Sequence, residues 1–196
     1  MKKVLRALSL ALVIAMLAVT AFADSYVPSI RQKDAMEIKD VTVTMADGTE
    51  IKLKAADIVV TPLVDSEKLS EADQKLLEDA YQSILKAGSV RKAAPKLVEL
   101  LDEAKLNVDD FVVRDLVFVQ FLNETMKQDG VKVTVQLEMK VAKDAQVLAM
   151  RYVSVEGGEY EWSPIALEDV TVNADGTVDV VLDGEGPVAF LVKSAK

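Results

Sequence analysis

Carboxylates are the main reactive groups in this sequence of 196 residues, which contains 32 Asp and Glu residues but no His and no Cys. Without imidazole there is no Ser-His triad and no His-ligated metal. Without thiols there is no disulfide, no cysteine nucleophile and no Cys-ligated zinc. Any catalysis would have to use carboxylates, hydroxyls or lysines.

The acid/base pair of a glycosidase is the first chemistry that these carboxylates suggest. Glu138, Glu156, Glu159 and Glu161 lie on or between strands that we expect to be neighbours, so their side chains could converge. Surface charge explains them better, because Glu138 occupies the polar phase of its strand and two of the others flank Gly157-Gly158. We therefore expect solvated glutamates and a protein that is not an enzyme.

A calcium site is the second possibility. Residues 173–176 (Asn-Ala-Asp-Gly) and Asp179 supply oxygen ligands, but their spacing differs from that of an EF-hand loop. An Asx-turn, in which the side chain bonds to nearby backbone, explains the segment better. Looser acidic pairs are Asp109 with Asp110 and Asp183 with Glu185. None of these residues is assigned as a metal ligand.

Three aromatic residues could form a platform for a sugar. Tyr160 and Trp162 are two residues apart on a short strand and therefore face the same side, and Tyr152 lies on the strand before it. Aromatic faces stack on the apolar faces of sugars. The single Trp of a β-sandwich is more often buried, so we favour a core position for Trp162.

A Ser-Lys nucleophile would need no His. Ser66 and Ser70 precede the first expected helix, where helix capping explains them, and no supporting motif accompanies an S-x-x-K spacing. Gly157-Gly158 opens no helix, so no phosphate-binding loop is expected. The sequence thus assigns no catalytic, cofactor-binding or metal-ligating residue, and no cofactor is expected.

The amino-terminal segment has the pattern of a secretory signal peptide. Basic residues at positions 2, 3 and 6 precede an apolar run at 7–21, which is shorter than the roughly 20 residues of a spanning helix. Ala21-Phe22-Ala23 then matches the small-x-small pattern of signal peptidase. We expect residues 1–23 to be a signal peptide cleaved after Ala23, which makes the mature protein secreted and leaves it without a membrane segment.

The remaining chain divides by pattern into three parts. Residues 24–36 are polar and aperiodic, and we expect a flexible leader. Residues 37–110 mix strands with two helices: a hairpin forms around Ala46-Asp47-Gly48, and Ser70 and Gly88 cap the first helix, whose apolar face consists of Ala72, Leu76, Leu77, Ala80, Ile84 and Ala87. We expect both helices to lie on a sheet.

Residues 111–196 consist of successive strands. The run 111–122 is apolar apart from Arg114-Asp115 and Gln120, which predicts a central strand covered on both faces. Residues 131–141 alternate strictly between apolar and polar side chains. The fold class we expect is α+β: a small sheet with two helices, followed by an antiparallel β-sandwich that is immunoglobulin-like or similar. The two regions would either share one core or have a core each.

The net charge of −9 argues against nucleic acid as a partner. Polyanion binding requires clustered Lys and Arg, and no basic run occurs after residue 23. An acidic surface mainly keeps a protein soluble.

Three carboxy-terminal segments, Glu161-Trp162-Ser163-Pro164, Asp175-Gly176-Thr177-Val178 and Gly186-Pro187-Val188-Ala189-Phe190, resemble a β-sandwich module of small secreted and surface proteins of Gram-positive anaerobes. The chain departs from that pattern at Gly186, where a Ser usually precedes the Pro. These are turn and core residues, so the resemblance implies location and fold only.

The function expected from the sequence is an exported, non-catalytic binding or structural module at the bacterial cell surface or in the medium. Its partner would be an unidentified protein or glycan. One alternative is an extracellular, carboxylate-dependent hydrolase of glycosidase type. Another is a protein-binding subunit of a surface assembly.

Overall fold

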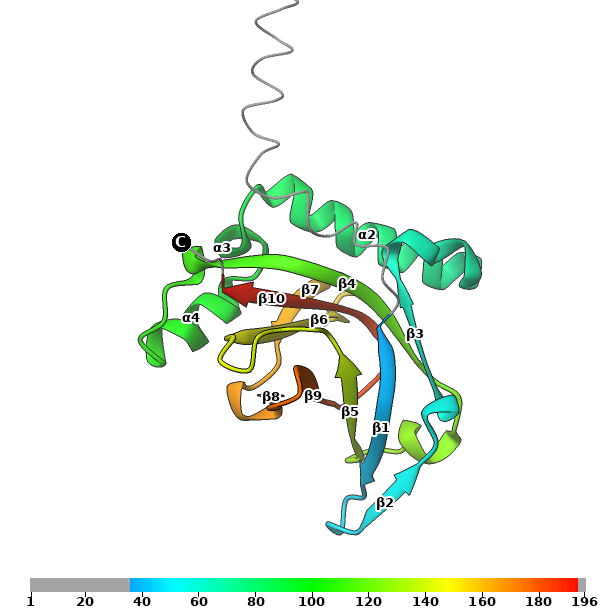
Figure 1. Ribbon diagram of the computed structural model, residues 1–196. Helices are drawn as coiled ribbons and strands as arrows, with labels where there is room; N and C mark the ends of the chain where they lie inside the picture. Colours follow the sequence, from blue (N-terminus) through cyan, green and yellow to red (C-terminus); the bar gives the residue numbers. More distant parts are fainter. Residues whose placement is uncertain (1–35, 194–196) are drawn as a thin grey trace, which may run out of the picture.

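Two antiparallel sheets of five strands each, together with a group of helices, form the protein (Figure 1). The computed structural model describes residues 36–193, so the predicted signal peptide and, apart from Met36, the predicted leader lie outside the described residues. The first sheet has the order β2 (Glu50–Leu53), β1 (Glu37–Thr44), β5 (Lys132–Glu138), β9 (Thr177–Leu182) and β8 (Val170–Val172). The second has the order β3 (Ile58–Pro62), β4 (Phe111–Phe121), β10 (Gly186–Lys193), β6 (Val147–Ser154) and β7 (Tyr160–Pro164). The predicted α+β class with antiparallel sheets is confirmed.

The hairpin of β1 and β2 follows directly from its sequence. Val43 pairs with Ile51 across the hairpin, and Gly48 takes the positive φ of 84° that the connecting turn requires. Along β1 the side chains of Val41 and Val43 are buried, whereas the residues between them are only partly buried. The predicted hairpin with one polar face is confirmed.

Strands from both halves of the chain meet in each sheet. β1 pairs with β5 in the first sheet, and β3 pairs with β4 in the second. Residues 37–110 and 111–193 therefore share both sheets and the core between them. That core contains one face of each sheet, with Val133, Val135, Val178 and Val180 from the first and Val117, Val119, Val188 and Phe190 from the second.

β4 is an inner strand with apolar residues on both faces, as the sequence predicts. Its pairing with β10 shifts register at Arg114, where the strand carries a β-bulge. The extra residue reverses the alternation, so that Val113 and Leu116 both face the helices. The polar interruption Arg114-Asp115 thus marks a change of phase within one strand.

Helices cover the outer face of the second sheet. α2 (Glu71–Ala87) lies over β4 and β10, followed by α3 (Val90–Ala93) and α4 (Pro95–Glu103), the latter beside β7 (Figure 1). The expected caps are confirmed, because Ser70 accepts the N–H of Asp73 and Gly88 ends α2 in the left-handed region. The predicted apolar face is wrong in one detail: Ala72 is exposed, and Tyr81 lies in the core instead.

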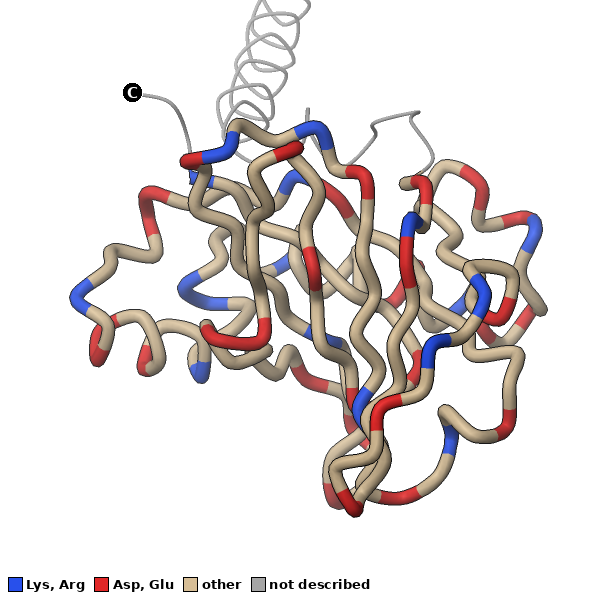
Figure 2. The backbone as a smooth tube through the Cα atoms, turned by 60° about the horizontal axis from the view of Figure 1, so that its bottom comes forward, with Lys and Arg blue, Asp and Glu red and all other residues tan. Residues whose placement is uncertain are grey.

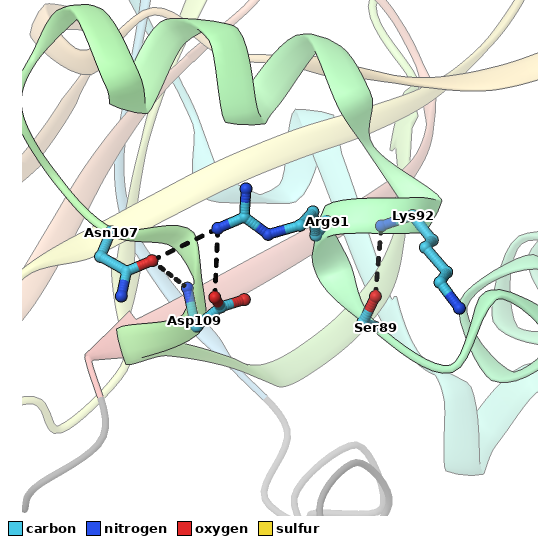
Figure 3. A network of polar contacts seen from close by, with 5 residues as sticks. All are labelled: Ser89, Arg91, Lys92, Asn107 and Asp109. Carbon is cyan, nitrogen blue, oxygen red and sulfur yellow. Dashed lines mark hydrogen bonds and ion pairs between the residues drawn. The ribbon is translucent and has the colours of Figure 1, made fainter.

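Short 3₁₀ helices make five of the connections: η1 (Ala55–Asp57), η2 (Leu63–Lys68), η3 (Val108–Asp110), η4 (Glu124–Lys127) and η5 (Leu167–Asp169). Asn107 anchors η3 to α3, because its Oδ1 accepts hydrogen bonds from Asp109 N and Arg91 Nη2 (Figure 3). Ser89 caps α3 through the N–H of Lys92. These contacts fix the segment that leads from the helices into β4.

Acidic and basic residues are interspersed along the described backbone, with acidic residues at several loop tips (Figure 2). Within residues 36–193 there is no helix with the length and apolar character of a membrane span.

Candidate functional site

Two largely buried charged side chains stand out because each has a fully buried atom that finds no hydrogen-bond partner. Among the described residues, the buried side-chain nitrogen and oxygen atoms in this state are Asp115 Oδ2 and Arg151 Nε. Folded proteins leave few such atoms, and each calls for an explanation. Both side chains belong to the second sheet and project from the face that packs on the first.

Arg151 lies on β6, between Val188 of β10 and Ser163 of β7. Val147 and Ala149 precede it in the same phase of the strand and belong to the core between the sheets. Its side chain is only 15% exposed. Burial lowers the pKa of the guanidinium, because removal from water disfavours the charged form.

A cleft of about 510 Å³ opens beside Arg151. It forms where β5 and β9 of the first sheet meet β6 and β7 of the second, and the chain from β7 to η5 closes one side. Its charged lining consists of Lys132, Arg151, Asp169 and Asp183. Its other lining residues are Ser163 and the apolar Val153, Pro164, Ile165, Ala166 and Val181. Small-molecule sites of proteins have volumes in this range.

The turn from β9 to β10 holds the guanidinium of Arg151 in place. Asp183 forms an ion pair with Nη1, and Nη2 donates a hydrogen bond of 3.3 Å to the carbonyl oxygen of Glu185. A Cβ on Gly184 would lie 2.9 Å from Nη2, so glycine permits the close approach of this turn. A second ion pair of the lining joins Lys132 and Asp169, whose Nζ and Oδ2 atoms lie 3.8 Å apart.

Asp115, by contrast, is enclosed at the β-bulge of β4. Its side chain is 12% exposed, and Oδ2 lies 3.4 Å from Arg114 Nε without a hydrogen bond. Burial raises the pKa of Asp115 to about 6, although the nearby positive charge of Arg114 acts in the opposite direction. Arg114 also donates a hydrogen bond of 2.6 Å to the carbonyl oxygen of Met139, which connects the two sheets.

The structure does not gather the four glutamates considered for catalysis. Glu138 is on β5 of the first sheet, where Lys39 lies 2.7 Å away and lowers the pKa of its carboxyl group. Glu161 is on β7 of the second sheet and pairs with Lys96 of α4. Glu156 and Glu159 are exposed in the turn between β6 and β7.

The acidic residues considered for calcium are engaged within the protein. Asp175 Oδ1 accepts hydrogen bonds from both the backbone N–H and the hydroxyl of Thr177, which is the expected Asx-turn. Asp179 accepts a hydrogen bond from the side chain of Gln136, and Asp109 accepts one from the side chain of Arg91. Glu185 accepts a hydrogen bond from the backbone N–H of Phe121. Asp110 lies 4.0 Å from Lys193. Within the described residues, no group of three or more acidic side chains is arranged to hold a metal ion.

Trp162 is buried beneath α2, as favoured from the sequence. It is 2% exposed, and its Nε1 donates a hydrogen bond of 2.8 Å to Ser83 Oγ. Tyr152 stacks on Tyr160 with ring centroids 5.4 Å apart, and Tyr160 is 45% exposed. Because Trp162 is covered, the three rings do not form an open platform.

Of the two serines considered as nucleophiles, Ser70 caps α2, and Ser66 lies in η2. Sequence reasoning did not single out Arg151. A signal for it exists: Arg151 is the one charged residue of β6, and it continues the phase of Val147 and Ala149. A charged residue on the face of a strand that is otherwise apolar indicates either that the buried part of the strand ends there or that the charge is itself buried.

Comparison with known proteins adds no assignment to this geometry: the chain matches no protein-family model, no curated protein and no solved structure.

Proposed function

We propose that the protein is an exported, non-catalytic binding module of the bacterial cell surface or the surrounding medium, and that it holds its ligand in the cleft beside Arg151. The observation that carries this proposal is a cleft of about 510 Å³ with a largely buried guanidinium in its wall. A charged group held among apolar and polar lining residues provides both orientation and specificity for a small ligand.

The location rests on the amino-terminal pattern, with cleavage after Ala23, and on the resemblance to small surface proteins of Gram-positive anaerobes. The ligand would be a small molecule or a chemical group of a surface glycan or protein. An immunoglobulin-like connection of the strands stays a prediction. The antiparallel pairing within both sheets is compatible with it.

A hydrolase is the second candidate, because Asp169 and Asp183 both line the cleft. A glycosidase requires two carboxyl groups that face the scissile bond from either side. Here each carboxylate lies beside a cation, Asp169 beside Lys132 and Asp183 beside Arg151. The cleft therefore presents two ion pairs, which favours binding over hydrolysis.

A ligand screen followed by mass analysis tests the proposal. Small carboxylates, sugars and short peptides would each be added to the purified protein while its thermal unfolding is recorded. We expect at least one class to raise Tm, to lose this effect in Arg151→Gln, and to be recovered chemically unchanged. Conversion of the compound would show an enzyme, and protection that persists fully in Arg151→Gln would place the site elsewhere.

A further inference from the structure

We infer that the cleft binds a small molecule with a single carboxylate and an apolar body, and that Asp183 is an internal counter-ion that the ligand carboxylate displaces from Arg151. This inference rests on the proposed function, because it identifies the ligand class of the same cleft. It is carried by the unmet hydrogen-bonding capacity of Arg151, the exposure of Asp183 and the composition of the lining.

The guanidinium of Arg151 has more donors than the protein satisfies. Arginine carries five N–H groups in a planar fork. Nη1 and Nη2 carry two N–H groups each, and the contacts to Asp183 and to the carbonyl oxygen of Glu185 use one of each pair, while Nε is buried without a partner. Removing a guanidinium from water without saturating its donors is unfavourable, and a carboxylate that bonds to Nη1 and Nη2 relieves part of this cost. Arg151 is therefore prepared for a planar anion.

Asp183 is suited to leave. Its side chain is 77% exposed on the turn, whereas the Arg151 side chain is 15% exposed. An exposed carboxylate that moves from the guanidinium into water regains its hydration, so exposed partners contribute little to an ion pair. Gly184 follows it directly, and a residue without Cβ lets the turn change conformation at little steric cost.

The charge of the cleft selects a monoanion. Asp169 also lines the cleft, and Asp183 stays nearby after it has been displaced. A dianionic phosphate would meet both carboxylates, whereas a monocarboxylate meets less repulsion. The two cations of the lining, Lys132 and Arg151, then balance the ligand and one of the two aspartates.

The other lining residues define the body of the ligand. Val153, Pro164, Ile165, Ala166 and Val181 supply the apolar part of the lining, with Ser163 as its one neutral polar side chain. Burying apolar area of a ligand against these five residues is favourable, whereas hydroxyl groups placed there would find no hydrogen-bond partners on their side chains. An aliphatic or aromatic carboxylate fits better than a sugar acid.

Calorimetric titration of the purified protein with butanoate and benzoate, and with butanamide, benzamide and inorganic phosphate for comparison, tests the inference. We expect a carboxylate to bind and its amide and phosphate not to bind. Arg151→Gln should weaken binding about tenfold or more, because a charge-assisted bidentate contact is lost. If that variant does not fold, Arg151→Lys, which keeps the charge but not the fork, should weaken binding in the same direction.

Asp183→Asn tests the counter-ion. Loss of its charge removes the internal competitor, so we expect carboxylates to bind about two- to fivefold more tightly. Asp109→Asn is the matched control, because Asp109 forms an exposed ion pair with Arg91 outside the cleft lining. The affinity of this variant for carboxylates should equal that of the wild type. Weaker binding by Asp183→Asn would overturn the displacement.

The outcomes separate this inference from the proposed function. If neutral amides or sugars bind as well as carboxylates and Arg151→Gln abolishes their binding, the cleft is a binding site but the ligand class is wrong. If no carboxylate binds and no compound of the wider ligand screen depends on Arg151, both the inference and the proposed function fail.

Discussion

The two faces of the second sheet differ in how completely they are closed. The face beneath α2 and α4 buries mainly apolar and aromatic side chains, with Thr61 as a buried polar residue opposite Phe118. The indole Nε1 of Trp162 on this face donates a hydrogen bond to Ser83. The face toward the first sheet buries an apolar core of its own but also holds Asp115 and Arg151, each with an unsatisfied atom. The same sheet thus has one closed face and one open face.

The difference suggests that the helix-covered face contributes to stability, whereas the face toward the first sheet holds the candidate site. Buried charges with unmet hydrogen bonds cost stability, so a site that keeps them is a candidate for another role. On the open face the two charges are also unlike each other. Arg151 lines a cleft, whereas Asp115 is enclosed at a β-bulge and can reduce its cost by taking up a proton. Four substitutions test this division, from the largest expected effect to the smallest.

Trp162→Ala should damage the closed face most. Removing a fully buried Trp side chain beneath α2 leaves a large cavity, and we expect the free energy of unfolding to fall by about 3–5 kcal/mol in urea titrations monitored by circular dichroism. Tyr160→Ala, which removes an exposed ring from the same strand, is the control and should cost much less. If ligand affinity of the folded fraction falls together with stability, the two faces are not independent.

Asp115→Asn should stabilise the open face near neutral pH. The pKa of Asp115 is raised from its usual 3.8 to about 6, which corresponds to a cost on the order of 3 kcal/mol once the carboxyl is ionised in the folded state. Below about pH 4 the carboxyl is protonated in both states and costs nothing. As the pH rises from about 4 to 6, the carboxyl ionises in the unfolded state but not in the folded state, so the free energy of unfolding of the wild type falls. Above pH 6 this loss is complete.

Urea titrations of the wild type and Asp115→Asn at pH 4 and pH 7 measure this effect. We expect the variant to be more stable at pH 7 and the difference to shrink at pH 4. An equal difference at both pH values would show that the charge of Asp115 is not the source of its cost.

What the sequence predicts correctly consists mostly of local features. Gly48 and the alternation of Val41 and Val43 define the first hairpin, and Ser70 and Gly88 define the ends of α2, because each signal lies within a few residues of its effect. Pairing of β1 with β5 spans about ninety residues and depends on which edges meet in the folded chain. No local pattern carries that information.

The candidate site escaped prediction for a related physical reason. Strand alternation places Arg151 in the phase of Ala149, but whether that phase is covered at Arg151 depends on where β9 and β5 end. The interruption at Arg114-Asp115 is visible in the sequence, yet the register shift behind it is a property of the pairing with β10. To predict that Arg151 or Asp115 is buried, one must know where the first sheet lies against the second.

Ser83→Ala should weaken the closed face without opening it. The substitution leaves Trp162 Nε1 buried without its acceptor, and we expect a loss of about 1–3 kcal/mol in the free energy of unfolding and a shift in Trp fluorescence. Ser154→Ala, at an exposed position on β6, is the control. An unchanged stability would mean that water or another group satisfies the indole.

Ser70→Ala should have the smallest effect, because it acts at the exposed end of α2. Its hydroxyl accepts the N–H of Asp73 at 3.2 Å, and loss of an N-terminal cap costs about 1 kcal/mol. Hydrogen exchange should become faster in the first turn of α2, while the Trp fluorescence stays as in the wild type because Ser83 lies far along the helix. A shifted fluorescence would show that fraying reaches the closed face. If the affinity for carboxylates were unchanged in that case, the helix-covered face would still be independent of the cleft.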